Sequence, residues 1–183
     1  MINIRHARID ERFKTFKWYC DIFEKNDNLD ESIIQKYTYE EYLEDFRDVY
    51  FDPLRQSYGS VMIIQNDDEE IGCMCYACFH LHSNSAELDI WLKDEATCGM
   101  GFGTGALKQL IKYLIKKKGI RFFLIRPSEQ NIRAISSYKK AGFLVADDKK
   151  EAISKYLKPQ YIEEYGDGDY GFNDTAVMVL ENI

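Results

Sequence analysis

The spacing of apolar residues predicts several strands along the chain. Apolar residues alternate with polar ones, or form short runs, in INIRHA, SVMIIQ, IGCMCYACFHL and ELDIWLK, and these patterns are typical of strands. The turn-forming segments NDDEE and HSNSA separate the last three of them, so we expect an antiparallel meander there. Shorter apolar segments later in the chain, RFFLIRP, FLVA and TAVMVLE, predict further strands.

Other segments repeat their apolar residues every three or four positions, which is the period of a helix. In TYEEYLEDFRDVYF, Thr38 and Glu41 have the spacing of a capping box and mark a helix start. The segment ALKQLIKYLI predicts a long helix, whose C-terminus suits the positive charges of Lys116–Lys118 and whose end is expected at Gly119. NIRAISSYKKAG predicts another helix, which stops at Gly142.

Two segments show neither period. From Asp10 to Ile34 the apolar residues are dense but poorly periodic, so the sequence predicts no definite element. The stretch from Lys149 to Asp174 is rich in tyrosine and acidic residues and is expected to be irregular. The strands and helices together predict the α/β class with a mixed sheet.

Composition narrows the class of protein. With 183 residues, 45% of them hydrophobic, we expect one domain over residues 1–183. No apolar run approaches the roughly 20 residues of a membrane helix, and the N-terminus lacks a secretory signal, so a cytoplasmic protein without a membrane partner is expected. The net charge of −7 argues against nonspecific nucleic-acid binding and suits a cationic partner, although acidity also serves solubility.

The cysteines are expected to be reduced core thiols. Three of the five lie in CMCYAC, where strand alternation places Cys73 and Cys75 on one face and Cys78 on the other. A zinc site would need a second cluster of ligands, which the three histidines do not supply. No metal site is therefore predicted.

The segment CGMGFGTGALKQL has a glycine at every second position and then opens a helix. Glycines allow close approach of a ligand and positive φ, while the first helical turn offers unpaired N–H groups, so the segment predicts a phosphate cradle. A Walker loop is excluded because no Gly-Lys-Ser or Gly-Lys-Thr follows. The glycine spacing also matches the dinucleotide-binding fingerprint. In that motif an acidic residue at the end of the next strand would hold the ribose, whereas the next strand here ends in Arg126.

Two separated motifs resemble those of the GNAT acetyltransferases. GMGFGTGAL resembles their pyrophosphate loop, and NIRAISSYKKAGF resembles their later helix, with Asn131, Tyr138, Gly142 and Phe143 at the matching places. The resemblance covers roughly residues 70–145 and includes the closing strand AVMVLE. It implies a mixed, largely antiparallel central sheet flanked by helices, and acetyl-CoA as cosubstrate.

The resemblance also implies which residues bind the coenzyme. In the family, successive amides of the glycine-rich loop hold the pyrophosphate. The usual Arg or Gln at the first position of that loop is Cys98 here, which removes one side-chain contact but no amide. The implied coenzyme-binding residues are Ile90, Trp91, Leu92, Gly99, Met100, Gly101, Phe102, Gly103, Thr104, Gly105, Asn131, Ala134 and Tyr138.

The segment LDIWLKDEATCGMGFGTGAL, followed by RPSEQNIRAISSYKKAGF, resembles the aminoglycoside 6′-N-acetyltransferases within this superfamily. The resemblance implies that Asp89 contacts the amine and takes its proton, and that Tyr138 protonates the departing thiolate in a direct attack within a ternary complex. Arg126 replaces an aspartate of that family's segment. Without the resemblance, Asp89 reads as a solvent-facing carboxylate and Tyr138 as a core tyrosine.

The acceptor is expected to be a small cationic amine, most simply the 6′-amine of an aminoglycoside. YIEEYGDGDYGFND combines acidic and aromatic residues that suit an amino sugar, although a solvated loop explains it equally. The candidate substrate residues are Glu87, Asp89, Trp18, Asp167 and Asp169. Alternatives are a siderophore hydroxylysine or other small-amine acetyltransferase, a noncatalytic coenzyme A sensor and a Rossmann oxidoreductase; either a monomer or a homodimer is compatible with the sequence.

Overall fold

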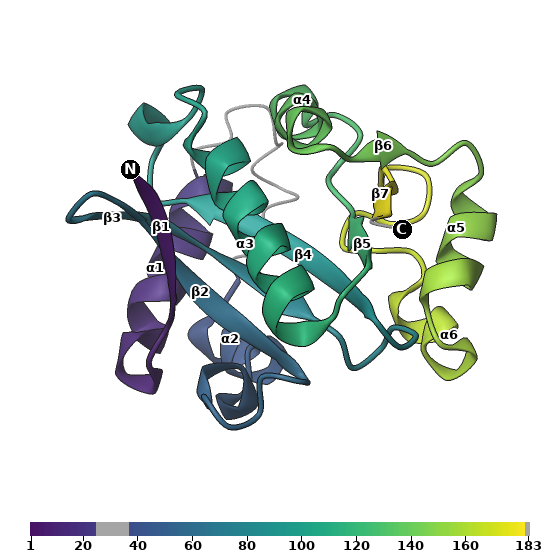
Figure 1. Ribbon diagram of the computed structural model, residues 1–183, viewed down its shortest axis with the longest axis horizontal. Helices are drawn as coiled ribbons and strands as arrows, with labels where there is room; N and C mark the ends of the chain where they lie inside the picture. The colour runs from purple at the N-terminus through teal and green to yellow at the C-terminus, as the bar shows by residue number, and fades with distance from the viewer. Residues whose placement is uncertain (25–36, 182–183) are drawn as a thin grey trace. The chain divides into compact units, whose positions relative to one another are not determined.

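The computed structural model describes residues 1–24 and 37–181, which form an α/β fold (Figure 1). The strands are β1 (Ile2–His6), β2 (Gly59–Asn66), β3 (Glu69–Ala77), β4 (Ser85–Leu92), β5 (Phe122–Ile125), β6 (Leu144–Val145) and β7 (Met178–Glu181). The helices are α1 (Arg12–Glu24), α2 (Tyr39–Asp45), α3 (Phe102–Lys118), α4 (Ile132–Ala141), α5 (Lys149–Tyr156) and α6 (Ile162–Tyr165).

The strands form one mixed sheet in the order β1-β2-β3-β4-β5-β7-β6. β1 pairs with β2, and β7 with both β5 and β6, in antiparallel fashion, whereas β4 and β5 are parallel. The connections from β2 to β3 and from β3 to β4 are too short for a parallel crossover, so these neighbours are antiparallel as well. The predicted largely antiparallel sheet flanked by helices is confirmed.

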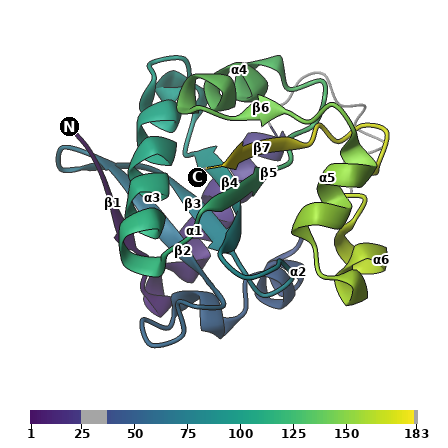
Figure 2. The same ribbon diagram turned by 45° about the vertical axis from the view of Figure 1, so that its right-hand side comes forward.

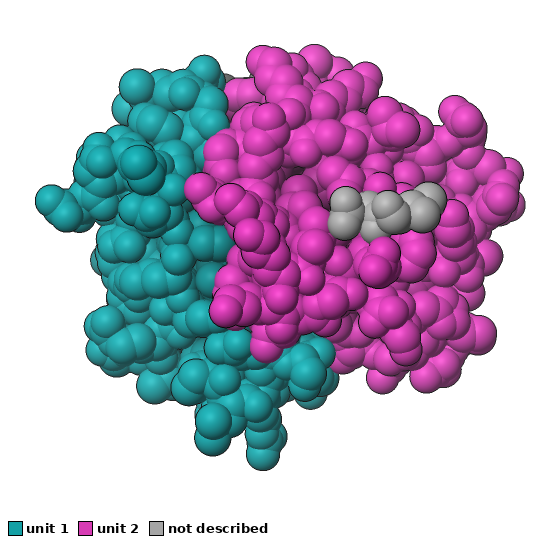
Figure 3. Space-filling model, in the orientation of Figure 1, with its two compact units in different colours: residues 1–75, 90–103 teal, residues 76–89, 104–183 magenta. Residues whose placement is uncertain are grey.

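The contacts of the chain divide it into two compact units (Figure 3). Unit 1 comprises Met1–Cys75 and Ile90–Gly103, and unit 2 comprises Tyr76–Asp89 and Thr104–Ile183. The division passes through β3, β4 and α3, each of which contributes residues to both units. A single domain over the whole chain stays a prediction.

Unit 1 has an aromatic core under α1 and α2. The predicted capping box starts α2, since the Glu41 amide donates to Thr38 Oγ1 over 3.2 Å and the Thr38 amide donates to Glu41 Oε2 over 2.7 Å. The helix ends at Asp45, and a separate 3-10 turn, η2 (Asp48–Phe51), follows where one continuous helix was expected. The fully buried Tyr42 hydroxyl lies 2.8 Å from Thr15 Oγ1 of α1.

The weakly patterned segment from Asp10 to Ile34 contains a 3-10 turn, η1 (Ile9–Glu11), followed by α1. The sequence predicts no definite element here because aromatic residues are distributed around the helix instead of along one stripe. The remainder of that segment, residues 25–34, lies outside the described residues.

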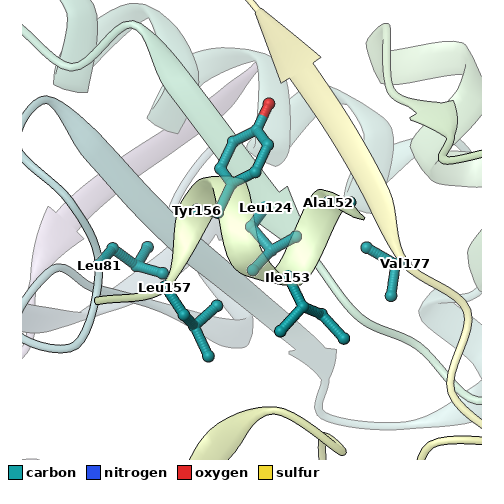
Figure 4. Close-up of a cluster of buried hydrophobic side chains, with 7 residues drawn as sticks. All are labelled: Leu81, Leu124, Ala152, Ile153, Tyr156, Leu157 and Val177. Carbon is teal, nitrogen blue, oxygen red and sulfur yellow. The ribbon is translucent and has the colours of Figure 1, made fainter. Parts of the chain in front are cut away.

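Unit 2 corrects the expectation that residues 149–174 are irregular, because this stretch contains α5, the 3-10 turn η4 (Pro159–Tyr161) and α6. Figures 1 and 2 both show α5 and α6 beside each other. The apolar residues of α5 pack against β5 in a buried cluster (Figure 4). Its members are Leu81, Leu124, Ala152, Ile153, Tyr156, Leu157 and Val177.

At one edge of the sheet, β6 is a strand of two residues next to β7. Its side chains are exposed, Leu144 at 72% and Val145 at 46%. The cysteines of the chain are free thiols, and Cys73 and Cys75 are buried in β3. Cys78 follows the end of β3, so the expected strand alternation does not extend to it. Among the described residues, no helix has the length and apolar character needed to cross a membrane.

Candidate active site

The glycine-rich segment forms an exposed turn that leads into α3. Gly99 and Gly101 have φ of +76° and +83°, values that favour glycine. Gly103 and Gly105 instead lie inside the first turns of α3, which begins at Phe102. Positive φ was expected at all four glycines. Because α3 already begins at Phe102, only Gly99 and Gly101 adopt it.

The turn fits a phosphate group. Within residues 1–24 and 37–181, no protein atom lies within 4 Å of the position that a Cβ would take at Gly99 or Gly101. Packing therefore does not demand glycine there, and the space beside the backbone is open to a ligand. The 17 residues of α3 start directly after it, with their unpaired first N–H groups and the positive end of the helix dipole. These features suit the pyrophosphate of coenzyme A.

The second motif forms α4 as predicted. Asn131 caps the helix by accepting from the Ala134 amide over 3.0 Å, and Gly142 ends it with a φ of +112°. The hydroxyl of Ser137 in α4 lies 2.8 Å from Thr104 Oγ1 in the first turn of α3. Unit 2 thus joins the two motifs through a direct side-chain contact. Cofactor contacts by Asn131 and Ala134 stay predictions.

Three side chains of unit 2 form one electrostatic neighbourhood. Burial raises the pKa of Tyr138, and the charge of Asp89 raises it further, with a smaller contribution from Tyr170. Burial and the charges of Asp89 and Asp169 raise the pKa of Tyr170 to well above its usual value. Tyr138 of α4 is only 6% exposed and keeps its proton at neutral pH. The charge of Asp89 acts on both Tyr138 and Tyr170. Tyr170 lies in the stretch whose acidic and aromatic residues were expected to suit an amino sugar, but it was not among the individually named candidates.

Beside Asp89 on β4, the carboxylate of Glu87 is held in an ion-pair network. Arg126 donates from Nε to Glu87 Oε1 over 2.5 Å and from Nη2 to Oε2 over 3.0 Å. His80 donates from Nε2 to Oε2 over 2.6 Å. Burial alone would raise the pKa of Glu87, but the charge of Arg126 and the hydrogen bonds from His80 and Arg126 lower it to about 2.

Both carboxylate oxygens of Glu87 accept from Arg126 and His80, and the substrate contact expected of Glu87 stays a prediction. Arg126 also donates from Nη1 to the carbonyl of Tyr165 over 2.5 Å, at the end of α6. Arg126, which immediately follows β5, thus links Glu87 of β4 to the end of α6 within the acidic stretch.

The other candidates occupy distinct places. In unit 1, the Trp18 ring lies 5.4 Å from Lys14 Nζ, and the buried Trp91 packs edge-on against Tyr19 with ring centroids 5.3 Å apart. In unit 2, the carbonyl of Asp167 accepts from Thr175 Oγ1 over 3.0 Å. Substrate contacts by Trp18, Asp167 and Asp169 and coenzyme contacts by Ile90, Trp91, Leu92 and Met100 stay predictions. In the part of the chain that the structure describes, no group of His, Cys, Asp or Glu is arranged to hold a metal ion.

Known proteins share this fold. The aminoglycoside acetyltransferase AAC(6')-Ib, in complex with coenzyme A and kanamycin, superposes with a TM-score of 0.68 at 17% identity, over 99% of this chain and 95% of that one. The Vibrio cholerae spermidine N-acetyltransferase, with CoA and spermine, gives 0.62 at 14% identity, over 99% and 95%. The Campylobacter jejuni N-acetyltransferase PseH gives 0.59 at 16% identity, over 100% and 99%. At these identities the likeness establishes a common fold.

The family is established by the sequence. Residues 3–144 match the acetyltransferase (GNAT) domain family, a range that includes β1 to β5, the glycine turn and α4. The match extends over both motifs, the glycine turn and α4. The chain therefore belongs to the GNAT acetyltransferase family and is an acetyl-CoA-dependent N-acetyltransferase.

Proposed function

We propose that this enzyme transfers the acetyl group of acetyl-CoA to a primary amine of a small polycationic acceptor, with the 6′-amine of an aminoglycoside as the first candidate. The observation that carries the proposal is the neighbourhood of Asp89, Tyr138 and Tyr170, in which the charge of Asp89 raises the pKa of both tyrosines. Similar folds in complexes with kanamycin and with spermine support an acceptor of this class. The net charge of −7 favours the same class.

Asp89 has two roles in this proposal. An alkylammonium group with a pKa of about 10 has no lone pair for attack, so it must lose a proton at neutral pH. The carboxylate of Asp89 attracts the ammonium group and then accepts this proton, either directly or through a water molecule. Its position on β4, two residues from the network that holds Glu87, places it on a rigid element.

Tyr138 has the complementary role. Bound acetyl-CoA supplies a thioester that the free amine can attack. Because burial and the charge of Asp89 raise the pKa of Tyr138, its hydroxyl stays protonated and can donate to a sulfur that gains negative charge. The turn at Gly99 and Gly101, with the start of α3, holds the pyrophosphate. Within unit 2, the contact between Thr104 and Ser137 joins α4 to α3.

The test is the release of free thiol from acetyl-CoA in the presence of kanamycin, tobramycin, spermidine, hydroxylysine or short peptides. We expect fast release with aminoglycosides that carry a 6′-amine and none when a hydroxyl replaces this amine. Rapid release with spermidine or hydroxylysine alone would move the acceptor to that amine. Tight coenzyme A binding without release for any amine would contradict the proposal and favour a coenzyme A sensor.

Asp89→Asn tests the residue that carries the proposal. We expect turnover to fall about 100-fold or more, with little change in acetyl-CoA affinity, because only proton acceptance is lost. Asp147→Asn is the matched control, since Asp147 is an exposed aspartate of the same unit. Equal rates for Asp89→Asn and the wild type would remove Asp89 from the mechanism.

A further inference from the structure

Unit 1 contains an open cavity that the acetyl-transfer proposal does not use. Its volume is about 770 Å³, which is within the size range of small-molecule sites. Its walls come from the start of α1, the end of α2, η2 and the segment before β2. The lining residues are Arg12, Leu43, Arg47, Asp48, Val49, Arg55, Ser57 and Tyr58.

The cavity lies apart from the coenzyme turn within unit 1. The cavity lies at the beginning of β2, whereas the glycine turn follows the end of β4. The end of β4 lies beside the beginning of β3, because the Lys93 amide donates to the Ile71 carbonyl over 2.9 Å. Since β3 starts where β2 ends, the two places lie at opposite ends of β2. The eight residues of this strand separate them by roughly 25 Å at about 3.3 Å per residue.

The charge of the cavity is opposite to that of the chain. Three arginines and one aspartate line it, which leaves a formal charge of +2 in a protein whose net charge is −7. Arg12 is 8% exposed, and its Nη1 and Nη2 donate to Asp48 Oδ1 over 2.5 Å and to the Leu43 carbonyl over 2.8 Å. Its Nε is buried and has no hydrogen-bond partner among the described residues. A buried donor without a partner is uncommon in proteins, and this one lies beneath the surface that a ligand in the cavity would touch.

The remaining polar groups are arranged around the same space. The guanidinium of Arg47 lies 5.6 Å from the centroid of the Tyr58 ring and donates to its hydroxyl. Arg55 is exposed and its Nε lies 3.6 Å from Asp52 Oδ2, so its side chain can move to a ligand at small cost. Ser57 and Tyr58 add hydroxyl groups, so both guanidinium and hydroxyl groups line the cavity.

We infer that this cavity binds a small molecule with a phosphate monoester group. Such a group carries a charge of about −1.5 to −2 at pH 7, which matches the charge of the cavity, and three oxygens that accept from guanidinium forks and hydroxyls. Arg47 and Arg55 hold the phosphate, and Arg12 supplies buried positive charge behind them. The ligand is of opposite charge to the proposed amine acceptor, so the two sites take different molecules.

The test is a calorimetric titration with glycerol 3-phosphate, inorganic phosphate and succinate at constant ionic strength. Saturating dephospho-coenzyme A is present so that phosphate does not bind at the glycine turn; it keeps the pyrophosphate but lacks the 3′-phosphate monoester, so it does not compete at the cavity. We compare the wild type with the double variant Arg47→Gln, Arg55→Gln, and with Arg121→Gln as the control. Arg121 is an exposed arginine of unit 2 that does not line the cavity.

We expect saturable binding of glycerol 3-phosphate to the wild type and the control, and at least tenfold weaker binding to the double variant. Equal affinity in all three proteins, or no saturable binding to any, would overturn the inference. Succinate that binds as tightly as glycerol 3-phosphate would overturn the assignment to phosphate. No variant changes the turn, so the comparison remains valid even if dephospho-coenzyme A does not bind there. Arg55→Gln alone, at an exposed position, gives a second variant that is expected to fold.

Discussion

Removal of the charge at Arg126 is expected to destabilise unit 2. In Arg126→Met, the carboxylate of Glu87 loses both hydrogen bonds from the guanidinium and keeps only the one from His80. The carbonyl of Tyr165 loses its donor as well. Glu87 and Arg126 are both largely buried, with side chains 17% and 7% exposed, so water replaces these contacts poorly.

Two approaches give a similar magnitude for the loss in the free energy of unfolding. The pKa of Glu87 is lowered from 4.5 to about 2 in the folded protein, which corresponds to about 3 kcal/mol of stability at neutral pH. Removal of one partner from a buried ion pair costs about 3–5 kcal/mol. We therefore expect Arg126→Met to lower the free energy of unfolding by about 3 kcal/mol, or the melting temperature by about 6–12 °C in a chain of this length.

The assay needs a reporter in the right unit. Both tryptophans of the chain, Trp18 and Trp91, lie in unit 1, so their fluorescence follows that unit. Urea unfolding followed by far-UV circular dichroism reports on the whole chain, and hydrogen exchange of the β5 amides reports on unit 2. Arg121→Met is a matched control, because Arg121 immediately precedes β5 as Arg126 immediately follows it, but it is exposed.

The pH dependence gives a separate check with Glu87→Gln. Because the folded pKa of Glu87 lies below its unfolded value, its ionised form stabilises the fold above about pH 4.5, and this contribution is lost as pH falls toward about 2. The stability difference between the wild type and Glu87→Gln is therefore expected to shrink over this interval. An Arg126→Met variant no less stable than Arg121→Met, or a difference that does not change with pH, would refute the reasoning.

Two further predictions concern the coenzyme. Gly101→Ala is expected to weaken acetyl-CoA binding about tenfold or more. The control is Gly119→Ala at the other end of α3, where a similarly positive φ of +68° and equally open surroundings give matched backbone strain, so we expect unchanged affinity. Equal affinities of the two variants in equilibrium dialysis would exclude the turn from the site. Tyr138→Phe is expected to lower kcat about 100-fold with little effect on the dissociation constant of acetyl-CoA. Equal losses in rate and affinity would instead indicate a packing role for Tyr138.

Local signals in the sequence predicted much of the fold, because each of them acts over a few residues. The capping box at Thr38 and Glu41, the Asn131 cap and the stop at Gly142 all form as expected. The spacing of apolar residues did not predict the helices between residues 149 and 174. In α5 only a few apolar residues are buried and lysines lie on both sides of them, and α6 has only four residues. Elements this short depend on tertiary packing more than on their own periodicity.

The candidate site was predictable only in part. The two motifs indicated a coenzyme site, and the family resemblance indicated Asp89 and Tyr138 as its catalytic residues. Nothing local indicated that Glu87 pairs with Arg126, which is 39 positions away and immediately follows the neighbouring strand β5. The signal was a carboxylate in one strand and an arginine at the end of another, but it becomes readable only once the pairing of these strands is known. The role of Tyr170 likewise follows from tertiary proximity to Asp89.

The short edge strand β6 affects how the protein behaves at high concentration. An uncovered edge with apolar side chains is where sheets of separate molecules join and begin to aggregate. With Leu144 and Val145 exposed, β6 has the apolar character of such an edge, but it offers only two residues of backbone to an incoming strand. A foreign strand would gain few hydrogen bonds there, so the brevity of β6 protects the chain against fibrillar growth from this edge.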